Sequence, residues 1–554
     1  MPTSVRSQAA ATAADVPRAE KLPGNVPSPS PASGGWGRLW LEGAGAAILL
    51  GPGLVWNVLS PSNLYTYHHL LPLHTVTRAV AADLILLSVA GMFAVRLLER
   101  ASGDLAHRAD GSRRKVVDLI WAVWLGLLAA RGMQGLLVAE LVSWDQVSAS
   151  RAFLLVAGGL MLVAAISASR YERIVRGLRY AVLLLGLSIL WIVPTLAVRS
   201  HRQQAYDLEQ FSKVLPAPPA GHRRIVWLLF DGLSYDQVFE HRWPGLALPN
   251  FDRLHAQSVT FSGMKPDGSY TEDVVPSLLM GKRIVEVRGT ADGGMLYRSA
   301  KQGPWQRFDG SASLFADAER EGWTTGLIGI FNPYCRLLRN QLDSCWMDLP
   351  PAAYGMSRDE STPANLAALS SELWENPFPI SADKRPSQAT PLSEIAAVDV
   401  ADRLIANERV DFCFVHLGVP HPPGHYDRKT GRLLTGGSYI DNLALADRIL
   451  ERLLADVAKT DAAGRTTVVV SSDHSWRVWL WRNAFGWTRE DEAASEEGHG
   501  FDPRPTLLVR FPGERSSFVV RRPVPLLAMH DLLEGTLGGE IADAQQLQDW
   551  AARQ

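Results

Sequence analysis

The hydrophobic and polar positions divide the chain into two unlike parts near residue 200. Long apolar runs dominate the first part, whereas the second alternates short apolar segments with charges and turns. The five long runs are Trp40–Leu59, Val76–Leu97, Val116–Val142, Ala152–Ala168 and Tyr180–Val198. A helix needs ~20 apolar residues to cross a bilayer. The pattern therefore predicts a bundle of about five transmembrane helices over residues 36–200, of which the fourth is the shortest.

The basic residues between these runs predict an orientation. Lys and Arg are frequent before the first run and in the loops after the second and fourth runs, and are scarce in the other two loops. Because these residues accumulate on the cytoplasmic side, we expect a multi-pass protein of the inner (plasma) membrane. Its N-terminus would be cytoplasmic and its C-terminal domain periplasmic or extracellular. Residues 1–35, rich in Ala, Pro, Ser and Gly, are expected to form a disordered cytoplasmic tail and not a cleaved signal peptide.

The second part of the chain has the pattern of an α/β domain. After an expected linker at residues 201–222, five short runs that are apolar on both faces begin near residues 225, 324, 411, 466 and 505. Such runs are typical of buried strands in a mostly parallel sheet. Amphipathic helical patterns precede the second, third and fourth runs. This alternation predicts a doubly wound α/β catalytic domain over residues 223–540. The acidic stretch 489–497 is expected to be an exposed turn or a mobile loop.

Composition narrows the classes of partner. The net charge is −2 and the mean hydropathy is −0.01, so bulk electrostatics favour neither nucleic acid nor an acidic partner. The predicted spans make membrane lipids the expected surroundings, and nothing in the sequence specifies an oligomeric state. Of the three cysteines, Cys335 and Cys345 either form a local disulfide or remain free thiols. Cys413 lies in an apolar run and is expected to be a buried thiol.

Ionisable residues follow three of the predicted strands. They are Asp231 after the first, His416, His421 and His425 in or beyond the third, and Asp473 with His474 after the fourth. One such residue has an ordinary explanation as a helix cap or a surface histidine. Three strand ends together indicate one site, because open α/β sheets bind ligands at the carboxyl ends of their strands. With His499, the set offers carboxylate and imidazole ligands, which suit Zn²⁺ or a similar divalent ion such as Mn²⁺.

Several motifs resemble the alkaline phosphatase superfamily, with an order and spacing similar to its sulfatase and phosphodiesterase branches. They are IVWLLFDGLSYD, LPNFDRLHAQSVTF, TEDVVPSLLMGK, VVVSSDH and GHG. In that superfamily the nucleophile lies ten residues before a glycine, at the start of a helix. Gly281 thereby implies Thr271 as the nucleophile. Sulfatases proper have there a Cys or Ser that becomes formylglycine. A Thr is typical of phosphodiesterases, phosphoethanolamine transferases and lipoteichoic acid synthase, and the last two also resemble this chain in having five membrane helices.

The resemblance also implies the metal ligands. One ion would be bound by Asp231, Thr271, Asp473 and His474. A second would be bound by His421, His425 and His499, where His421 replaces the Asp of a Pro-Asp-x-x-Gly-His pattern. That replacement removes a negative charge and leaves either one ion or two to be expected. His416 either contacts substrate or has a structural role.

These residues predict an enzyme that acts on phosphate esters. Thr271, activated by metal coordination, would attack phosphorus and form a covalent phospho-enzyme, which water or an acceptor hydroxyl then resolves. The membrane anchor favours transfer of a phospho-head group from a phospholipid to a cell-envelope acceptor such as a glycan. Hydrolysis of a phosphodiester is the alternative, and sulfate-ester hydrolysis is disfavoured by the Thr. An interpretation of another class is a non-catalytic relative that only binds envelope ligands.

Overall fold

The computed structural model describes residues 35–51, 59, 73–107, 120–129, 131–132, 171–202, 210–216, 222–290, 293–348, 361–364, 366–367, 389–461, 464–482, 487–497, 502–515 and 517–554. The main helices are α1 (Trp36–Leu50), α4 (Leu73–His107), α7 (Tyr171–Gly186), α8 (Ile189–Arg202), α9 (Pro249–His255), α10 (Thr271–Met280), α11 (Leu314–Arg320), α12 (Tyr334–Leu337), α14 (Ala389–Ile405), α15 (Tyr439–Thr460), α16 (Val478–Trp481), α17 (Arg489–Glu497), α18 (Met529–Gly538) and α19 (Ala544–Arg553). The strands are β1 (Gln210–Ser212), β2 (Arg224–Phe230), β3 (Val259–Phe261), β4 (Met264–Lys265), β5 (Glu286–Gly289), β6 (Met295–Arg298), β7 (Gln306–Arg307), β8 (Thr325–Ile330), β9 (Ser344–Asp348), β10 (Phe412–Leu417), β11 (Gly424–Asp427), β12 (Arg432–Gly437), β13 (Thr466–Ser471), β14 (Leu507–Arg510), β15 (Phe518–Val520) and β16 (Val524–Pro525).

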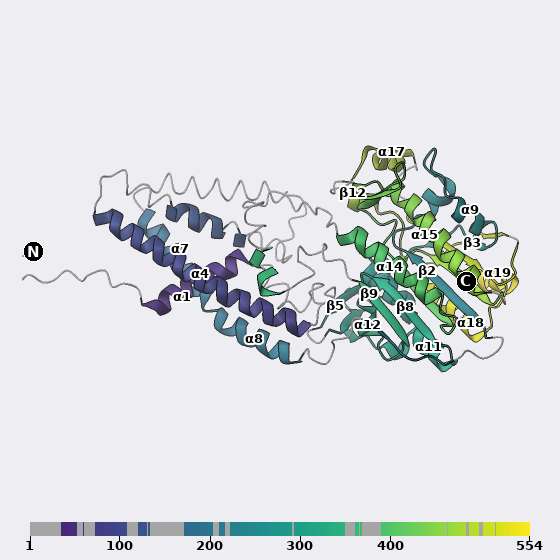
Figure 1. Ribbon diagram of the computed structural model, residues 1–554, viewed down its shortest axis with the longest axis horizontal. Helices are drawn as coiled ribbons and strands as arrows, with labels where there is room; N and C mark the ends of the chain where they lie inside the picture. The colour runs from purple at the N-terminus through teal and green to yellow at the C-terminus, as the bar shows by residue number, and fades with distance from the viewer. Residues whose placement is uncertain are drawn as a thin grey trace, which may run out of the picture.

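The N-terminal helices form an elongated bundle that extends away from the sheet domain (Figure 1). Within the described residues, two helices are long and apolar enough to cross a membrane: Thr77–Ser102, and Arg173–His201, which comprises α7 and α8. A shorter apolar helix covers Ile120–Ala129 in the third predicted span. The fourth predicted span and the predicted tail, apart from its last residue, lie outside the described residues. The structure is thus compatible with a membrane anchor, whereas the number of five spans stays a prediction.

A cluster of charges joins three helices of the bundle. Glu42 of α1 is buried and receives hydrogen bonds from Arg38 at 2.8 Å and from Arg179 of α7 at 2.7 Å. The same Arg179 also donates to Glu99 of α4 at 2.6 Å and lies 4.4 Å from the ring centre of Trp121. Each buried charge in this cluster has an opposite charge beside it, as burial at an apolar helix interface requires.

The C-terminal domain contains, in its described residues, a nine-stranded sheet in the order β1-β9-β8-β10-β2-β13-β14-β3-β15. The five strands β9, β8, β10, β2 and β13 are parallel. Four of the five apolar runs predicted as parallel strands are therefore adjacent and parallel. The fifth, β14, pairs with β13 in the antiparallel direction. The doubly wound α/β architecture is confirmed, and the carboxyl ends of β10, β2 and β13 meet at one edge.

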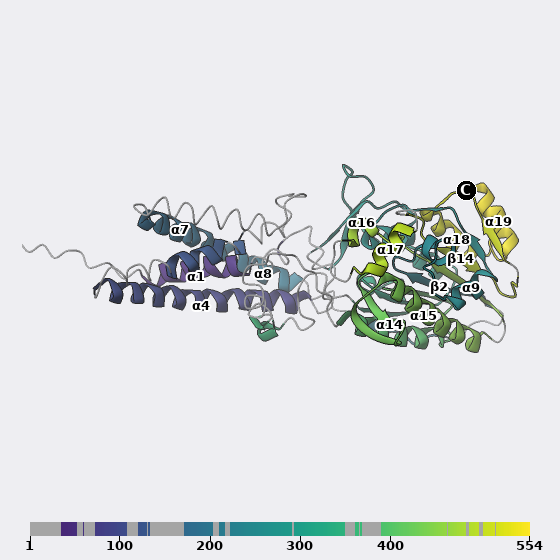
Figure 2. The ribbon, with the colours of Figure 1, turned by 90° about the horizontal axis from the view of Figure 1, so that it is seen from above.

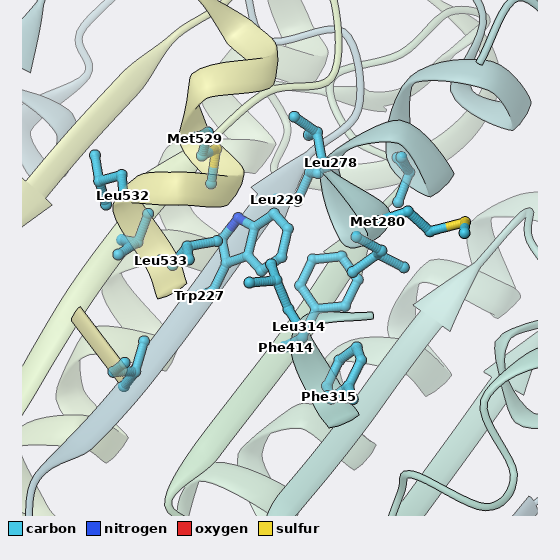
Figure 3. Packing of buried hydrophobic residues seen from close by; sticks show 14 of the residues in the cluster. Trp227, Leu229, Leu278, Met280, Leu314, Phe315, Phe414, Met529, Leu532 and Leu533 are labelled. Carbon is cyan, nitrogen blue, oxygen red and sulfur yellow. The ribbon is translucent and has the colours of Figure 1, made fainter. Parts of the chain in front are cut away.

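The central strands bury both faces, which explains their continuous apolar sequences. In β2, Ile225, Trp227 and Leu229 belong to one core cluster, and Val226, Leu228 and Phe230 to the other. Helices α10, α11 and α18 cover the first face, and α14 and α15 cover the second. Figure 3 shows the first cluster, in which Trp227 packs among Leu278 of α10, Phe315 of α11 and Met529 of α18. This packing fixes α10, and with it Thr271, against the sheet.

Several elements lie where the sequence pattern is weak. β1 falls inside the segment expected to be a linker and pairs with β9 as an edge strand. α19 extends the fold past residue 540 and buries Leu547 and Trp550 in the first cluster. The acidic stretch expected to be a turn or mobile loop is the helix α17. Cys335 and Cys345 form a disulfide, and Cys413 is a buried free thiol.

Candidate active site

Two strand ends deliver most of the candidate metal ligands. Asp231 comes directly after β2, and its backbone N–H donates to the carbonyl of Leu417 in β10 at 2.9 Å. Asp473 and His474 follow the adjacent strand β13. Gly232 has a φ of +75°, and a Cβ there would lie 3.5 Å from the His474 ring. The space would accept a Cβ, so glycine is favoured at this turn by its positive φ, which it adopts without strain.

The oxygen and nitrogen atoms of these residues are spaced as metal ligands are. Nε2 of His474 lies 3.2 Å from Oδ1 of Asp231 and 3.4 Å from Oδ2 of Asp473. Both carboxylate oxygens are buried, and neither has a hydrogen-bond partner among the described residues. Ligand atoms held ~2.0–2.1 Å from a tetrahedral ion lie roughly 3.3 Å apart. Two carboxylate oxygens without hydrogen-bond partners at this spacing fit a divalent cation, and this combination of His and Asp ligands suits zinc.

The imidazole of His474 is oriented to present Nε2 to the site. Its Nδ1 lies 2.9 Å from the carbonyl oxygen of Ser475, so Nδ1–H donates and the Nε2 lone pair stays available. Oδ1 of Asp473 is fixed separately, accepting from the backbone N–H groups of Gly232 at 3.2 Å and His474 at 2.9 Å. These contacts hold the ligands in place before any ion binds.

Electrostatics keep the Asp231 carboxyl ionised. Burial by itself would raise its pKa, but the neighbouring imidazoles of His421 and His474 lower the pKa well below its usual range. Burial likewise lowers the pKa of His474, yet the Asp473 and Asp231 carboxylates outweigh it and the pKa is raised. The four ligands predicted for the first ion thus include two carboxylates and no lysine or arginine. Such a concentration of negative charge is typical of a metal site.

Thr271 is the first residue of α10 and points its hydroxyl at this group. Its Oγ1 lies 3.5 Å from Oδ2 of Asp231 and 3.5 Å from Nε2 of His474. The side chain is 2% exposed. Helix α10 ends at Gly281, which caps it with a φ of +61°. This left-handed cap favours glycine and gives the ten-residue interval in the motif a structural reason.

The predicted second set of ligands is only partly brought together. The ligand atoms of His421, Asp231 and His474 lie within 4.8 Å of one another. His425 is buried with an unpartnered Nδ1, but among the described residues it is not grouped with those three. Burial lowers the pKa of His421 and of His425 to about 4, so both imidazoles are neutral at pH 7. His499 lies outside the described residues.

His416 is held behind the site by a tyrosine. Its Nδ1 lies 2.6 Å from the hydroxyl of Tyr334, and the imidazole is fully buried. Its Nε2 has no hydrogen-bond partner. Burial also lowers the pKa of His416. The predicted contact with substrate stays a prediction.

The residue that sequence reasoning missed is Arg477. Its Nη2 lies 2.6 Å from Nε2 of His421, and its Nη1 donates to the carbonyl of Ser269 at 2.5 Å. The one sequence signal for Arg477 was its position three residues after His474, just beyond the end of β13.

Two tryptophans near Arg477 differ in burial. Trp476 is in the core, where its ring centre lies 4.3 Å from that of Tyr439, whereas Trp479 is 54% exposed.

The comparison with protein families decides the class of the domain. Residues 223–494 match the family model described as Sulfatase. The chain carries a sulfatase domain of the alkaline phosphatase superfamily. Enzymes of the sulfatase family are metal-dependent, which agrees with the orphaned carboxylates at the strand ends. The matched segment contains every candidate ligand of the described site and Thr271. None of the curated proteins matches the sequence.

Solved structures of the same superfamily are distant. PsFucS1 sulfatase from Pseudoalteromonas sp. is 14% identical, covering 57% of this chain and 68% of that chain, with a TM-score of 0.38. The phosphonate monoester hydrolase of Agrobacterium radiobacter is 15% identical over 57% and 74% of the two chains, with a TM-score of 0.36. An alkaline phosphatase superfamily protein from Vibrio parahaemolyticus is 15% identical over 58% and 68%, with a TM-score of 0.34. The assignment of the sulfatase domain rests on the family model.

Proposed function

We propose that this chain is a membrane-anchored, metal-dependent enzyme that cleaves a phosphate ester through Thr271 and passes the phosphoryl group to an acceptor. The observation that carries the proposal is the position of Oγ1 of Thr271, 3.5 Å from both Asp231 and His474. A hydroxyl at a helix start, turned toward two candidate metal ligands, has the placement of an activated nucleophile. Asp231, Asp473 and His474 would hold a divalent ion, Zn²⁺ being the best fit and Mn²⁺ the alternative.

The chemistry divides between the ion and the chain. A bound divalent ion would lower the pKa of the Thr271 hydroxyl and neutralise charge on the phosphoryl oxygens. The Thr271 hydroxyl loses its proton to solvent, its Oγ1 forms a bond to phosphorus, and the bond from phosphorus to the first alcohol breaks, with that alcohol taking up a proton from solvent as it leaves. The backbone N–H of Thr271, at the start of α10, would donate to a phosphoryl oxygen. The hydroxyl oxygen of an acceptor then attacks phosphorus and releases Thr271.

The residue at position 271 favours phosphate over sulfate esters. The resemblance implies a Cys or Ser there for formylglycine-dependent sulfatases, and this chain has Thr. A threonine hydroxyl forms a phosphoester directly and needs no prior modification. Because the family match is to sulfatases, hydrolysis of an ester is the second candidate function, with water in the place of the acceptor.

Transfer to or from the membrane is supported by the surroundings of the site. Helix α16 follows His474 and lies at the end of the domain nearest the N-terminal helices (Figure 2). Trp479 and Leu480 of α16 and Tyr270 beside Thr271 are 54%, 37% and 43% exposed. Aromatic and apolar side chains favour the membrane interface. A phospholipid donor and an envelope glycan acceptor are therefore the proposed substrates, with the domain on the outer face of the inner membrane.

The experiment that separates the candidates uses the full chain in detergent or vesicles. Phospholipids labelled in the head group are incubated with and without an envelope glycan as acceptor. Transfer predicts label on the acceptor and little free head group, whereas hydrolysis predicts free head group in both reactions. A zinc-loaded chain that releases and transfers nothing from any phosphodiester or sulfate ester would favour the non-catalytic interpretation.

A further inference from the structure

Arg477 is a buried cation beside the candidate nucleophile. It precedes α16 and is 6% exposed. Its Nη1 donates to the carbonyl of Ser269 at 2.5 Å, and its Cζ lies 5.6 Å from the ring centre of Tyr270. Because Ser269 and Tyr270 immediately precede Thr271, the guanidinium is held against the segment that leads into the nucleophile.

Within the described part of the chain, Arg477 makes no salt bridge. Its hydrogen bonds go to a carbonyl and to an imidazole, and its buried Nε has no hydrogen-bond partner there. The carboxyl of Glu272 attracts it only through space, and burial raises the pKa of that carboxyl. By contrast, Arg428 pairs with both Asp441 and Glu490, and Arg504 pairs with Glu240 and Asp502. A buried charge without a salt bridge is costly, and an anionic ligand would supply one.

His421 holds this guanidinium in place. Nη2 of Arg477 lies 2.6 Å from Nε2 of His421. Since arginine carries only donors, Nη2 donates and Nε2 accepts. The lone pair that accepts this hydrogen bond is not free to bind a metal ion. A divalent ion on that nitrogen would also face the guanidinium charge at hydrogen-bond distance.

We propose that Arg477 is the anion-binding residue of the site, and that His421 positions it instead of giving Nε2 to a second metal ion. The proposal rests on the proposed function and names the ligand class as a tetrahedral oxyanion, the phosphoryl group that Thr271 attacks. An ion held by Asp231, Asp473 and His474 would share the neutralisation of the phosphoryl oxygens with the guanidinium of Arg477. The planar fork of donors on arginine suits such an oxyanion.

The first test counts metal ions. The full-length protein in detergent is saturated with Zn²⁺, desalted and analysed for zinc per chain. We expect one tightly held ion per chain. Two tightly held ions in the wild-type chain, of which one is lost in His421→Ala, would overturn the proposal, because that ion would need the nitrogen that Arg477 occupies.

The second test measures the binding of inorganic phosphate to the zinc-loaded chain by calorimetry. A hydrogen bond to a charged group is worth ~1.5–3 kcal/mol, so R477M should weaken phosphate binding by at least about ten-fold. R477K keeps the charge but not the fork and should fall between wild type and R477M. The matched control is R482A, because Arg482 is a nearby arginine that pairs with Glu492 on the surface. It should bind phosphate as the wild type does.

The stability of R477M separates anion binding from a structural role. Replacing an unpaired buried charge with an apolar side chain of similar length should leave the thermal midpoint unchanged or raise it. A structural guanidinium would give the opposite result, a lower midpoint that R477K restores, and that would overturn the proposal. So would R477M affinity within two-fold of wild type, or a wild-type chain that binds no phosphate. If R477M fails to fold, the phosphate affinity of R477K tests the proposal instead. An R477K affinity for phosphate equal to that of the wild type would overturn the proposal.

These measurements do not need turnover. They can be made on the Thr271→Ala chain as well as on the wild type. If Thr271 proves dispensable for turnover, the proposed function fails while the phosphate affinities still decide the role of Arg477.

Discussion

The helical bundle and the sheet domain each bury charged side chains, and they treat them differently. In the bundle, buried Glu42 is flanked by Arg38 and Arg179, so its carboxylate has two cationic donors. In the sheet domain, Asp231 and Asp473 each keep a buried oxygen without a hydrogen-bond partner. A paired buried charge is explained by the fold alone. Orphaned carboxylates at the carboxyl ends of parallel strands indicate a ligand that completes them.

The largest expected effect comes from Thr271, whose hydroxyl lies 3.5 Å from both Asp231 and His474. Thr271→Ala should lower turnover by at least roughly 10³-fold, because removing a nucleophile leaves only binding and electrostatic contributions. Circular dichroism and the thermal midpoint should stay close to wild type, since one hydroxyl is lost from a packed helix. Thr430→Ala, on an exposed turn, is the matched control and should keep full activity. Full turnover in Thr271→Ala would contradict the proposed mechanism.

Metal removal tests the orphaned carboxylates directly. Chelation should abolish turnover, and adding back Zn²⁺ or Mn²⁺ should restore it. Asp231→Asn and Asp473→Asn each remove one anionic ligand. Each should weaken zinc affinity by about 10–100-fold or more, because changes at residues that only hydrogen-bond to metal ligands already cost that much. Zinc content is measured after desalting, with the exposed Asp549→Asn as control. Wild-type zinc content in both variants would mean that these oxygens complete no metal site.

The sequence predicted most of this domain because its strands bury both faces. Runs such as residues 225–230 and 466–471 are continuous and β-branched, and they became the central strands β2 and β13. Helix α15 was equally clear, because its apolar residues recur with helical spacing over a long segment. The strand ends then placed Asp231, Asp473 and His474 in one region. The orientation of β14 did not follow, because an apolar run has the same appearance in either direction.

The remaining features depend on contacts between distant residues. α17 looked like a solvated turn because its sequence is acidic, yet Thr488 caps it and Asp491 accepts a hydrogen bond from the backbone N–H of Tyr439 at 2.8 Å. β1 is only three residues long and forms by pairing with β9. Arg477 belongs to none of the sequence motifs, and its contact with His421 is visible only in the structure. In each case a neighbour far along the chain supplies the reason.

A smaller effect is expected in the bundle. Glu42→Gln removes the charge between two arginines, and the loss of charged hydrogen bonds should cost about 1–3 kcal/mol. Arg179 keeps Glu99 as a partner, which limits the loss. We expect a lower thermal midpoint in detergent with zinc content and phosphate affinity unchanged, and Glu451→Gln on the exposed face of α15 as a neutral control. A loss of zinc in Glu42→Gln would mean that the two regions are not independent.

The smallest effect concerns a buried carboxyl that makes no salt bridge with any described residue. Glu394 of α14 accepts a hydrogen bond from the backbone N–H of Gly418 at 3.2 Å, and burial raises its pKa to about 8 from 4.5. The folded chain therefore holds a proton there that the unfolded chain releases above its lower pKa, so stability falls as the pH rises between these two values. Glu394→Gln keeps an acceptor for Gly418 and has no proton to lose. Its thermal midpoint relative to wild type should rise from about pH 5 to about pH 8 and stay level above that. A difference that does not change with pH would contradict a raised pKa of Glu394 in the folded protein.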